Sequence, residues 1–146
     1  MRKINYIVVH CSATREGCTL TSEVLEAEHR RRGFRTTGYH YYIRRDGTVL
    51  GSRSLELPGA HCRGHNKYSI GICYEGGLDA RGNPKDTRTP EQRSALHLLV
   101  YQLLQQFRNA RVCGHRDLSP DLDGDGTVEP WEWVKQCPCF EVSKEF

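Results

Sequence analysis

Hydrophobic positions gather in short β-like runs. Residues 4–10 read Ile-Asn-Tyr-Ile-Val-Val-His and residues 69–74 read Ser-Ile-Gly-Ile-Cys-Tyr. Both runs are apolar and rich in β-branched residues, which predicts buried strands. A shorter run at 111–113 predicts another strand. Between residues 41 and 50, two β-rich runs flank Asp46-Gly47, and this dipeptide favours the tight turn of a hairpin.

Two segments carry the start signals of helices. Thr21 or Ser22 can cap a helix over about 23–32, which Gly33 ends. Thr89-Pro90-Glu91-Gln92 combines a capping threonine, a proline suited to the first turn and a glutamine that completes a capping box. A helical period of apolar residues then continues to about residue 108. A short helix is expected near 131–135. Strands alternating with helices predict one α/β domain over residues 1–146.

The composition excludes several classes of partner. The 146 residues carry 21 Lys and Arg against 18 Asp and Glu, and a net charge of +3 is too weak to indicate nucleic acid. The basic cluster at 30–32 is interpreted as a solvated helix end. No apolar stretch approaches the roughly 20 residues that span a bilayer, so no membrane partner is expected.

Seven cysteines are many for a chain whose N-terminal region lacks the apolar segment of a secretory signal. We therefore expect synthesis in the cytoplasm, a reducing compartment where disulfides are rare. One cysteine, Cys137, is considered below as a metal ligand. The others are expected to be mainly reduced at the site of synthesis: Cys11, Cys18, Cys62, Cys73, Cys113 and Cys139.

Candidate chemistry lies where strands end. His10 closes the first predicted strand, His115 follows the strand at 111–113, and Cys137 comes 22 residues later. Each of these residues, taken alone, is more often structural than functional. Their spacing also lacks the close pairs of a zinc finger, so spacing by itself does not establish a metal site.

Six short motifs occur in a familiar order. They are His10-Cys11-Ser12-Ala13-Thr14, Gly38-Tyr39-His40-Tyr41, Arg45-Asp46-Gly47-Thr48, Ser69-Ile70-Gly71-Ile72, Gly114-His115 and Lys135-Gln136-Cys137-Pro138. In these motifs the chain resembles the N-acetylmuramoyl-L-alanine amidases of the phage-lysozyme and peptidoglycan-recognition-protein type, from about Ile4 to Glu141. The resemblance implies an α/β fold with a mixed central sheet flanked by helices and zinc at the floor of a surface groove.

The resemblance also implies roles for individual residues. His10, His115 and Cys137 would be the zinc ligands, and Tyr39 and Lys135 the two catalytic side chains. Two imidazoles and a thiolate leave a fourth position open, as catalytic zinc requires. A tyrosine hydroxyl and a lysine ammonium can stabilise an oxyanion or pass protons. The implied reaction is hydrolysis of the amide between N-acetylmuramic acid and L-alanine.

Two alternatives to a wall-degrading enzyme stay open. The chain could be a binding module for peptidoglycan without activity, although some such modules have lost a ligand and all three are present here. It could also be a cytosolic amidase that recycles soluble muropeptides. Recycling amidases carry an aspartate and a glutamate where this sequence has Cys137 and Cys73, which favours the phage and recognition-protein branch. We expect a monomeric endolysin that waits in the cytoplasm for release through a holin.

The loop His61-Cys62-Arg63-Gly64-His65-Asn66 matches the groove loop of the family. His61 and Asn66 are candidates for holding the glycan or the stem peptide of a peptidoglycan or muropeptide substrate. A loop this rich in glycine and histidine can equally be a plain surface turn.

The sequence departs from the compact phage members between Pro120 and Lys135. Counted from Asp121, oxygen-bearing residues fall at positions 1, 3, 5, 7, 9 and 12 of a twelve-residue insertion, and glycine at position 6. This is the pattern of an EF-hand calcium loop over 121–132, without evident flanking helices. The alternative is an acidic, solvated turn. The expected calcium ligands are Asp121, Asp123, Asp125, Thr127, Glu129 and Glu132.

Overall fold

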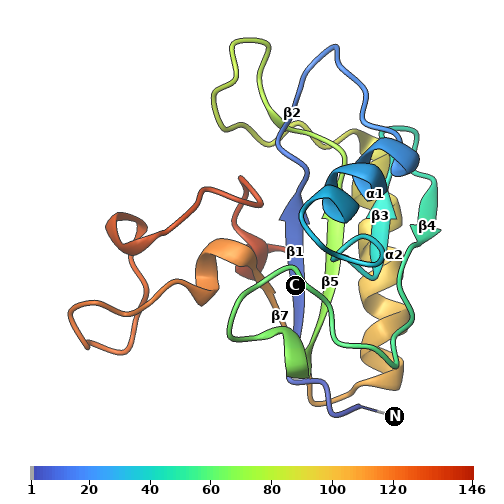
Figure 1. The fold of residues 1–146 in the computed structure, drawn as a ribbon. Helices are drawn as coiled ribbons and strands as arrows, with labels where there is room; N and C mark the ends of the chain where they lie inside the picture. Colours follow the sequence, from blue (N-terminus) through green and yellow to red (C-terminus); the bar gives the residue numbers. More distant parts are fainter. Residues whose placement is uncertain (1) are drawn as a thin grey trace.

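A five-stranded mixed sheet forms the centre of the molecule in the computed structural model, which describes residues 2–146 (Figure 1). The strand order is β4-β3-β5-β1-β7, in which β4 alone runs antiparallel to its neighbour. These strands are β1 (Tyr6–Cys11), β3 (Tyr41–Ile43), β4 (Val49–Gly51), β5 (Ser69–Tyr74) and β7 (Arg111–Gly114). The predicted α/β fold with a mixed sheet is confirmed.

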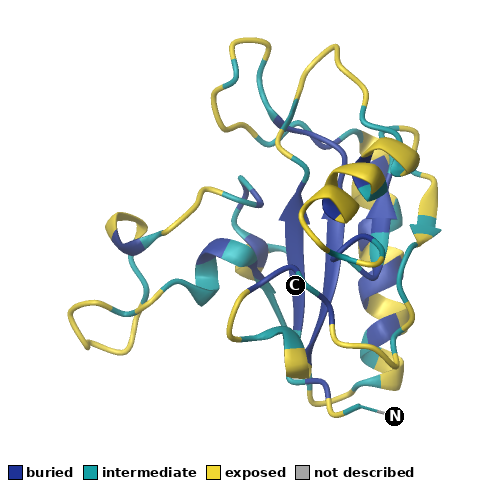
Figure 2. Cartoon of the chain, in the orientation of Figure 1, coloured by how far each residue is buried: buried dark blue, intermediate teal, exposed yellow. Residues whose placement is uncertain are grey.

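One helix covers each face of this sheet (Figure 1). Helix α2 (Pro90–Gln106) packs Leu96, Leu99 and Leu103 onto a core that includes Ile7, Val9, Ile70 and Ile72. Helix α1 (Ser22–Arg31) places Leu25 against Tyr42 and Cys73 on the opposite face. Strand β5 is buried along its whole length, and β1 is buried at every residue after Tyr6 (Figure 2). Nearly all of the apolar core therefore lies between the sheet and α2.

The alternating direction of side chains along β1 and β5 places apolar residues on one face of the sheet and the candidate site residues on the other. Successive side chains of a strand point to opposite faces. In β1, Ile7 and Val9 enter the core under α2, while His10 lines a pocket with residues of α1. In β5, Ile70 and Ile72 face the same core, and Gly71 and Cys73 face the other way. The α1 side of the sheet thus combines small residues with a histidine.

Both helices begin as their capping residues predict. The Thr21 hydroxyl accepts a hydrogen bond from the Val24 N–H at 3.2 Å. Thr89 and Gln92 form a reciprocal capping box, in which each side chain accepts the backbone N–H of the other at 3.1 and 3.0 Å. Each such cap stabilises a helix by about 1 kcal/mol, because it satisfies backbone donors that have no partner within the helix.

The structure departs from the sequence-based expectation at two places. A small parallel sheet pairs β2 (Thr14–Arg15) with β6 (Gly77–Leu78), and it was not predicted because two residues carry no periodic signal. The helix expected at 131–135 is wrong. Only a 3-10 turn, η3 (Pro130–Glu132), forms there, and the backbone is already extended at Trp133. The Glu132 carboxylate accepts the backbone N–H groups of Leu122 and Glu129.

The insertion forms a lobe at the edge of the sheet, beyond β7, and most of its residues are exposed (Figures 1 and 2). The remaining 3-10 turns are η1 (Asn66–Tyr68), η2 (His115–Leu118) and η4 (Val142–Lys144). Among residues 2–146, neither helix has the length and apolar character needed to cross a membrane.

Candidate active site

The two candidate histidines lie at the carboxyl ends of adjacent parallel strands. Strands β1 and β7 are in register through Val9 and Gly114, so the next residues, His10 and His115, are neighbours in space. Their ring centroids are 4.6 Å apart. This edge of an α/β sheet is where ligand-binding side chains commonly gather. Strand register therefore brings together two histidines that are far apart in the sequence.

Cys137 reaches the same point from the segment after the insertion. Its carbonyl accepts the backbone N–H of Arg116 at 2.9 Å, and its Sγ accepts the backbone N–H of Cys11 at 3.1 Å. One candidate ligand atom from each of His10, His115 and Cys137 lies within 4.8 Å of the other two.

This donor set fits zinc. Two imidazole nitrogens and one thiolate are borderline-soft ligands, and three protein ligands leave one position for water or substrate. Burial lowers the pKa of the His10 imidazole well below its usual range, and His61, His115 and Lys135 lower it further. His10 is therefore neutral at ordinary pH, which is the form that binds a metal.

Tyr39 lies beside this group, with its ring centroid 5.1 Å from that of His10. Burial raises the pKa of the Tyr39 phenol well above its usual range, and the neighbouring Cys73 and Cys137 raise it further. The hydroxyl consequently stays protonated at neutral pH and can donate a hydrogen bond. Such a donor stabilises negative charge that develops on a carbonyl oxygen.

Lys135 is the other candidate catalytic side chain. It is exposed, yet it lines the same pocket of about 340 Å³ as His10, Tyr39 and Cys137. The structure thus brings together all five residues that the resemblance singles out. A half-buried phenol and an exposed ammonium then lie in one pocket with the candidate metal group.

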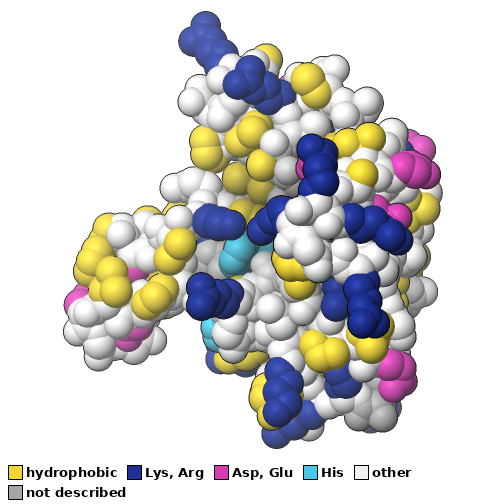
Figure 3. Space-filling view, in the orientation of Figure 1, with side chains coloured by type: hydrophobic (Ala, Val, Ile, Leu, Met, Phe, Trp, Pro, Cys, Tyr) yellow, Lys and Arg dark blue, Asp and Glu magenta, His cyan; other side chains and the backbone are white. Residues whose placement is uncertain are grey.

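A wider groove of about 670 Å³ continues from this pocket. Arg32, Phe34, Val134 and Lys135 line it, together with residues of the loop from Ala60 to Asn66. Figure 3 shows histidine in this hollow with Lys and Arg side chains around it. A groove with basic edges suits a substrate that carries carboxylates.

The two candidates for substrate binding lie differently. Asn66 lines the groove, and its side-chain oxygen accepts the backbone N–H groups of His61 and Cys62 at 3.0 and 2.9 Å. His61 is 9% exposed, and its Nδ1 lies 2.9 Å from Nε2 of His10. Its other nitrogen contacts the buried Ser69 hydroxyl at 3.1 Å. His61 therefore contacts a candidate metal ligand directly.

Sequence reasoning missed Ser69 as part of this site. Its signal was the period of two along β5, which places Ser69, Gly71 and Cys73 on the same face as the metal group. The acidic residues of the insertion do come together. Asp121, Asp123 and Glu132 have oxygens within 4.8 Å of one another, as do Asp123, Asp125 and Glu129.

Comparison with known proteins decides the family. The family model of N-acetylmuramoyl-L-alanine amidases matches residues 1–138. The endolysin of Klebsiella phage KP32 is 35% identical over 143 residues, which cover 98% of this chain and 85% of the endolysin. The chain belongs to the N-acetylmuramoyl-L-alanine amidase family.

Solved structures agree with this assignment. The N-acetylmuramoyl-L-alanine amidase LysC from Clostridium intestinale superposes with a TM-score of 0.75 at 26% identity, covering 99% of this amidase and 82% of LysC. Bumblebee PGRP-SA, at 22% identity, shares the fold with a TM-score of 0.73 over 99% of this chain and 81% of its own. The protein is a peptidoglycan amidase with the fold of the phage and recognition-protein type.

Proposed function

We propose that this amidase is zinc-dependent and cuts the bond between N-acetylmuramic acid and L-alanine in intact peptidoglycan. The observation that carries the proposal is the convergence of His10, His115 and Cys137 at one sheet edge, with Tyr39 and Lys135 around them. When bound, zinc supplies Lewis-acid chemistry that polarises the amide carbonyl and activates the attacking water.

The protein's own residues perform the remaining tasks. The groove orients the substrate, and Asn66 shapes the loop that lines it. The protonated Tyr39 hydroxyl donates a hydrogen bond to the carbonyl oxygen as negative charge develops there. The Lys135 ammonium adds positive charge at the same place and can deliver a proton to the leaving nitrogen. His61 and Asn66 remain candidates for contact with the glycan or the stem peptide.

The experiment is release of new amino groups from purified sacculi. The wild-type protein should release them, a strong chelator should abolish release, and added Zn²⁺ should restore it. Zinc content measured on the same samples links the metal to the activity. A protein that binds sacculi and releases nothing would instead be a binding module.

We further propose a role in lysis rather than recycling, as a monomer made in the cytoplasm and released through a holin. The similarity to a phage endolysin over nearly the whole chain supports it. The test compares intact sacculi with soluble anhydro-muropeptides at equal bond concentration. An endolysin should favour sacculi, whereas a recycling enzyme should act mainly on the soluble fragments.

Calcium at residues 121–132 is a second proposal about cofactors. Its support is the twelve-residue pattern together with the proximity of the acidic oxygens. Asp121 accepts the N–H groups of Gly124 and Gly126 at 3.0 and 2.7 Å, so the loop is already curved around its carboxylates. The facing carboxyls of Glu132 and Asp125 raise the pKa of Glu129 to about 8. A bound divalent cation would relieve this repulsion.

A further inference from the structure

A buried row of three polar side chains lies behind the candidate metal group. Nε2 of His10 is 2.9 Å from Nδ1 of His61, and Nε2 of His61 is 3.1 Å from the Ser69 hydroxyl. His10 and Ser69 are at most 1% exposed, and His61 is 9% exposed. Water has little access to these contacts, so the three groups satisfy one another.

The backbone is shaped to admit the ring of His61. A Cβ at Gly71 would lie 2.6 Å from Cγ of that ring, and a Cβ at Gly59 would lie 2.4 Å from its Cδ2. Neither glycine has a positive φ, so neither is required by backbone conformation. The two glycines therefore form a slot for the ring. The main-chain N–H of His61 donates to the side-chain oxygen of Asn66 at 3.0 Å, which fixes the residue in place.

Zinc on Nδ1 of His10 would fix which nitrogen carries each proton. With Nε2 of His10 engaged by His61, Nδ1 is the ring nitrogen left for a metal. Nδ1 must then be unprotonated, so Nε2 of His10 carries the proton and donates it to His61. His61 accepts at Nδ1, carries its own proton on Nε2 and donates to Ser69. A single direction of hydrogen bonds thus runs from His10 to Ser69.

We infer that His61 is a positioning residue for the metal site, holding His10 in the tautomer and orientation that bind zinc, with Ser69 fixing His61 in turn. The inference rests on the proposed zinc function and gives His61 a role toward the metal, separate from its candidate contact with the substrate. Outer partners of this kind typically contribute 10–100-fold to metal affinity.

The experiment measures zinc affinity by chelator competition, using Zn²⁺ alone and no substrate. His61→Phe keeps a ring in the slot and removes the acceptor, so zinc should bind about 10–100-fold more weakly. His61→Asn places an oxygen near the position of Nδ1 and should restore affinity to within a few-fold of wild type. His97→Phe makes the same replacement on α2, away from the site, and should leave zinc affinity unchanged.

The outcomes separate this inference from the function on which it rests. A wild-type protein that binds no zinc would refute the proposed function itself. Zinc binding in the wild type with equal affinity in His61→Phe would overturn the role of His61, as would equal weakening in the phenylalanine and asparagine variants. A rise in KM with unchanged zinc affinity would instead make His61 a substrate contact.

A second variant covers failure to fold. His61→Leu also lacks an acceptor and is smaller than the histidine ring, so it replaces the phenylalanine variant if that protein is not folded by circular dichroism. It should show the same loss of zinc affinity relative to His61→Asn.

Discussion

The chemistry of individual side chains at the site depends on the groups around them. Burial, together with the neighbouring Cys73 and Cys137, raises the pKa of the Tyr39 phenol, so its hydroxyl stays protonated and can donate a hydrogen bond. The Cys137 sulfur lies among the candidate metal ligands and accepts the backbone N–H of Cys11. Two predictions follow from these environments, one for the catalytic pair and one for the thiol.

Tyr39→Phe and Lys135→Ala should each keep zinc and lower turnover about 100-fold, because each removes a group that acts on charge formed in the transition state. Steady-state kinetics on sacculi, together with metal analysis, measure both quantities. Tyr101→Phe and Lys144→Ala make the same changes away from the site and should leave turnover unchanged. Normal turnover in both site variants would place catalysis elsewhere.

Cys137 should resist alkylation while zinc is bound, since a coordinated thiolate is shielded from the reagent. Mass spectrometry after brief iodoacetamide treatment measures the labelling of each cysteine. The exposed Cys18 is the internal standard and should react with or without metal. A chelator should make Cys137 reactive, and fast labelling of Cys137 in the zinc-loaded protein would contradict its role as a ligand.

At the scale of elements, local signals worked where several agreed. The capping box at Thr89 and the hairpin at Asp46-Gly47 are both present, and Gly47 adopts the positive φ that the turn requires. The helix expected near 131–135 failed, because only Pro130–Glu132 form a 3-10 turn and the backbone is extended at Trp133. A segment this short carries too few apolar positions for periodicity to distinguish a helix from a turn.

Calcium should raise the melting temperature if the loop at 121–132 binds it, with an affinity of about 10⁻⁴–10⁻³ M for a single exposed loop. Asp121→Ala and Glu132→Gln should remove that gain and leave zinc content unchanged. Glu56→Gln, an exposed acidic residue outside the loop, should keep it. If millimolar Ca²⁺ changes neither melting nor calorimetric heat, the insertion is an acidic turn.

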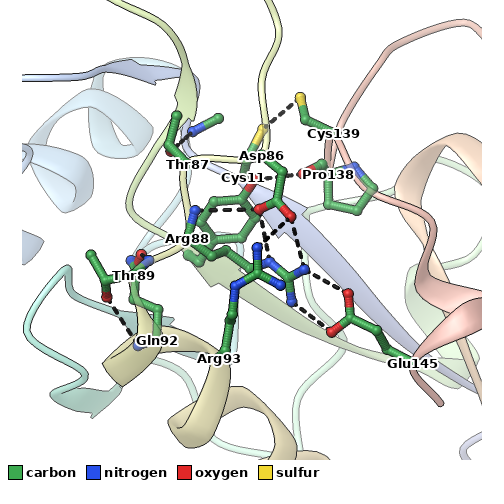
Figure 4. Close-up of polar contacts among 12 residues, drawn as sticks. Cys11, Asp86, Thr87, Arg88, Thr89, Gln92, Arg93, Pro138, Cys139 and Glu145 are labelled. Carbon is green, nitrogen blue, oxygen red and sulfur yellow. Dashed lines mark hydrogen bonds and ion pairs between the residues drawn. The ribbon is translucent and has the colours of Figure 1, made fainter.

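A buried arginine joins the C-terminal residues to the segment before α2 (Figure 4). The Arg88 side chain is fully buried, donates to Asp86 at 2.9 Å and Glu145 at 2.6 Å, and stacks 3.4 Å over the Phe140 ring. Cys139 lies nearby, with its sulfur 4.0 Å from that of Cys11 (Figure 4). This cluster ties down the chain just beyond Cys137 and so supports the candidate metal group.

Arg88→Met should lower the free energy of unfolding by about 3 kcal/mol, because it leaves two partly buried carboxylates without their common partner. Urea denaturation measures this loss. Arg93→Met is the matched control. Arg93 contacts the same Asp86 from an exposed position, so its removal should cost less than about 1 kcal/mol. Equal losses of unfolding free energy in the two variants would contradict the claim that the buried Arg88 contributes more to stability than the exposed Arg93.

The ion pair between Arg88 and Glu145 makes the stability depend on pH. The hydrogen bond from Arg88 lowers the pKa of Glu145 below its usual 4.5. A carboxyl with a lowered pKa in the folded state stabilises the protein above its unfolded pKa, and this contribution disappears as the pH falls through the folded value. The free energies of unfolding of wild type and Arg88→Met should therefore begin to converge as the pH falls below about 4.5, and the convergence is complete only below the lowered pKa of the folded state. A constant difference down to pH 3 would contradict the ion pair.

At the scale of the whole molecule, the sequence predicted the α/β fold and the candidate residues that the structure brings into one pocket, but neither Ser69 nor the arrangement of the group. Motif order identified His10, His115 and Cys137, whereas their convergence depends on the register between β1 and β7 and on how residue 137 is anchored. The contact between His61 and His10 could not be predicted at all. It depends on a slot formed by two glycines from different segments.

The N-terminal residue that digestion of sacculi newly exposes identifies the bond that this amidase cuts. Derivatisation of the released amino groups, followed by hydrolysis and chromatography, identifies that residue. We expect L-alanine as the new N-terminal residue after digestion by the wild-type protein, and no new N-terminus after treatment with His115→Ala. An N-terminus other than alanine, or new reducing sugar ends without new amino groups, would contradict it.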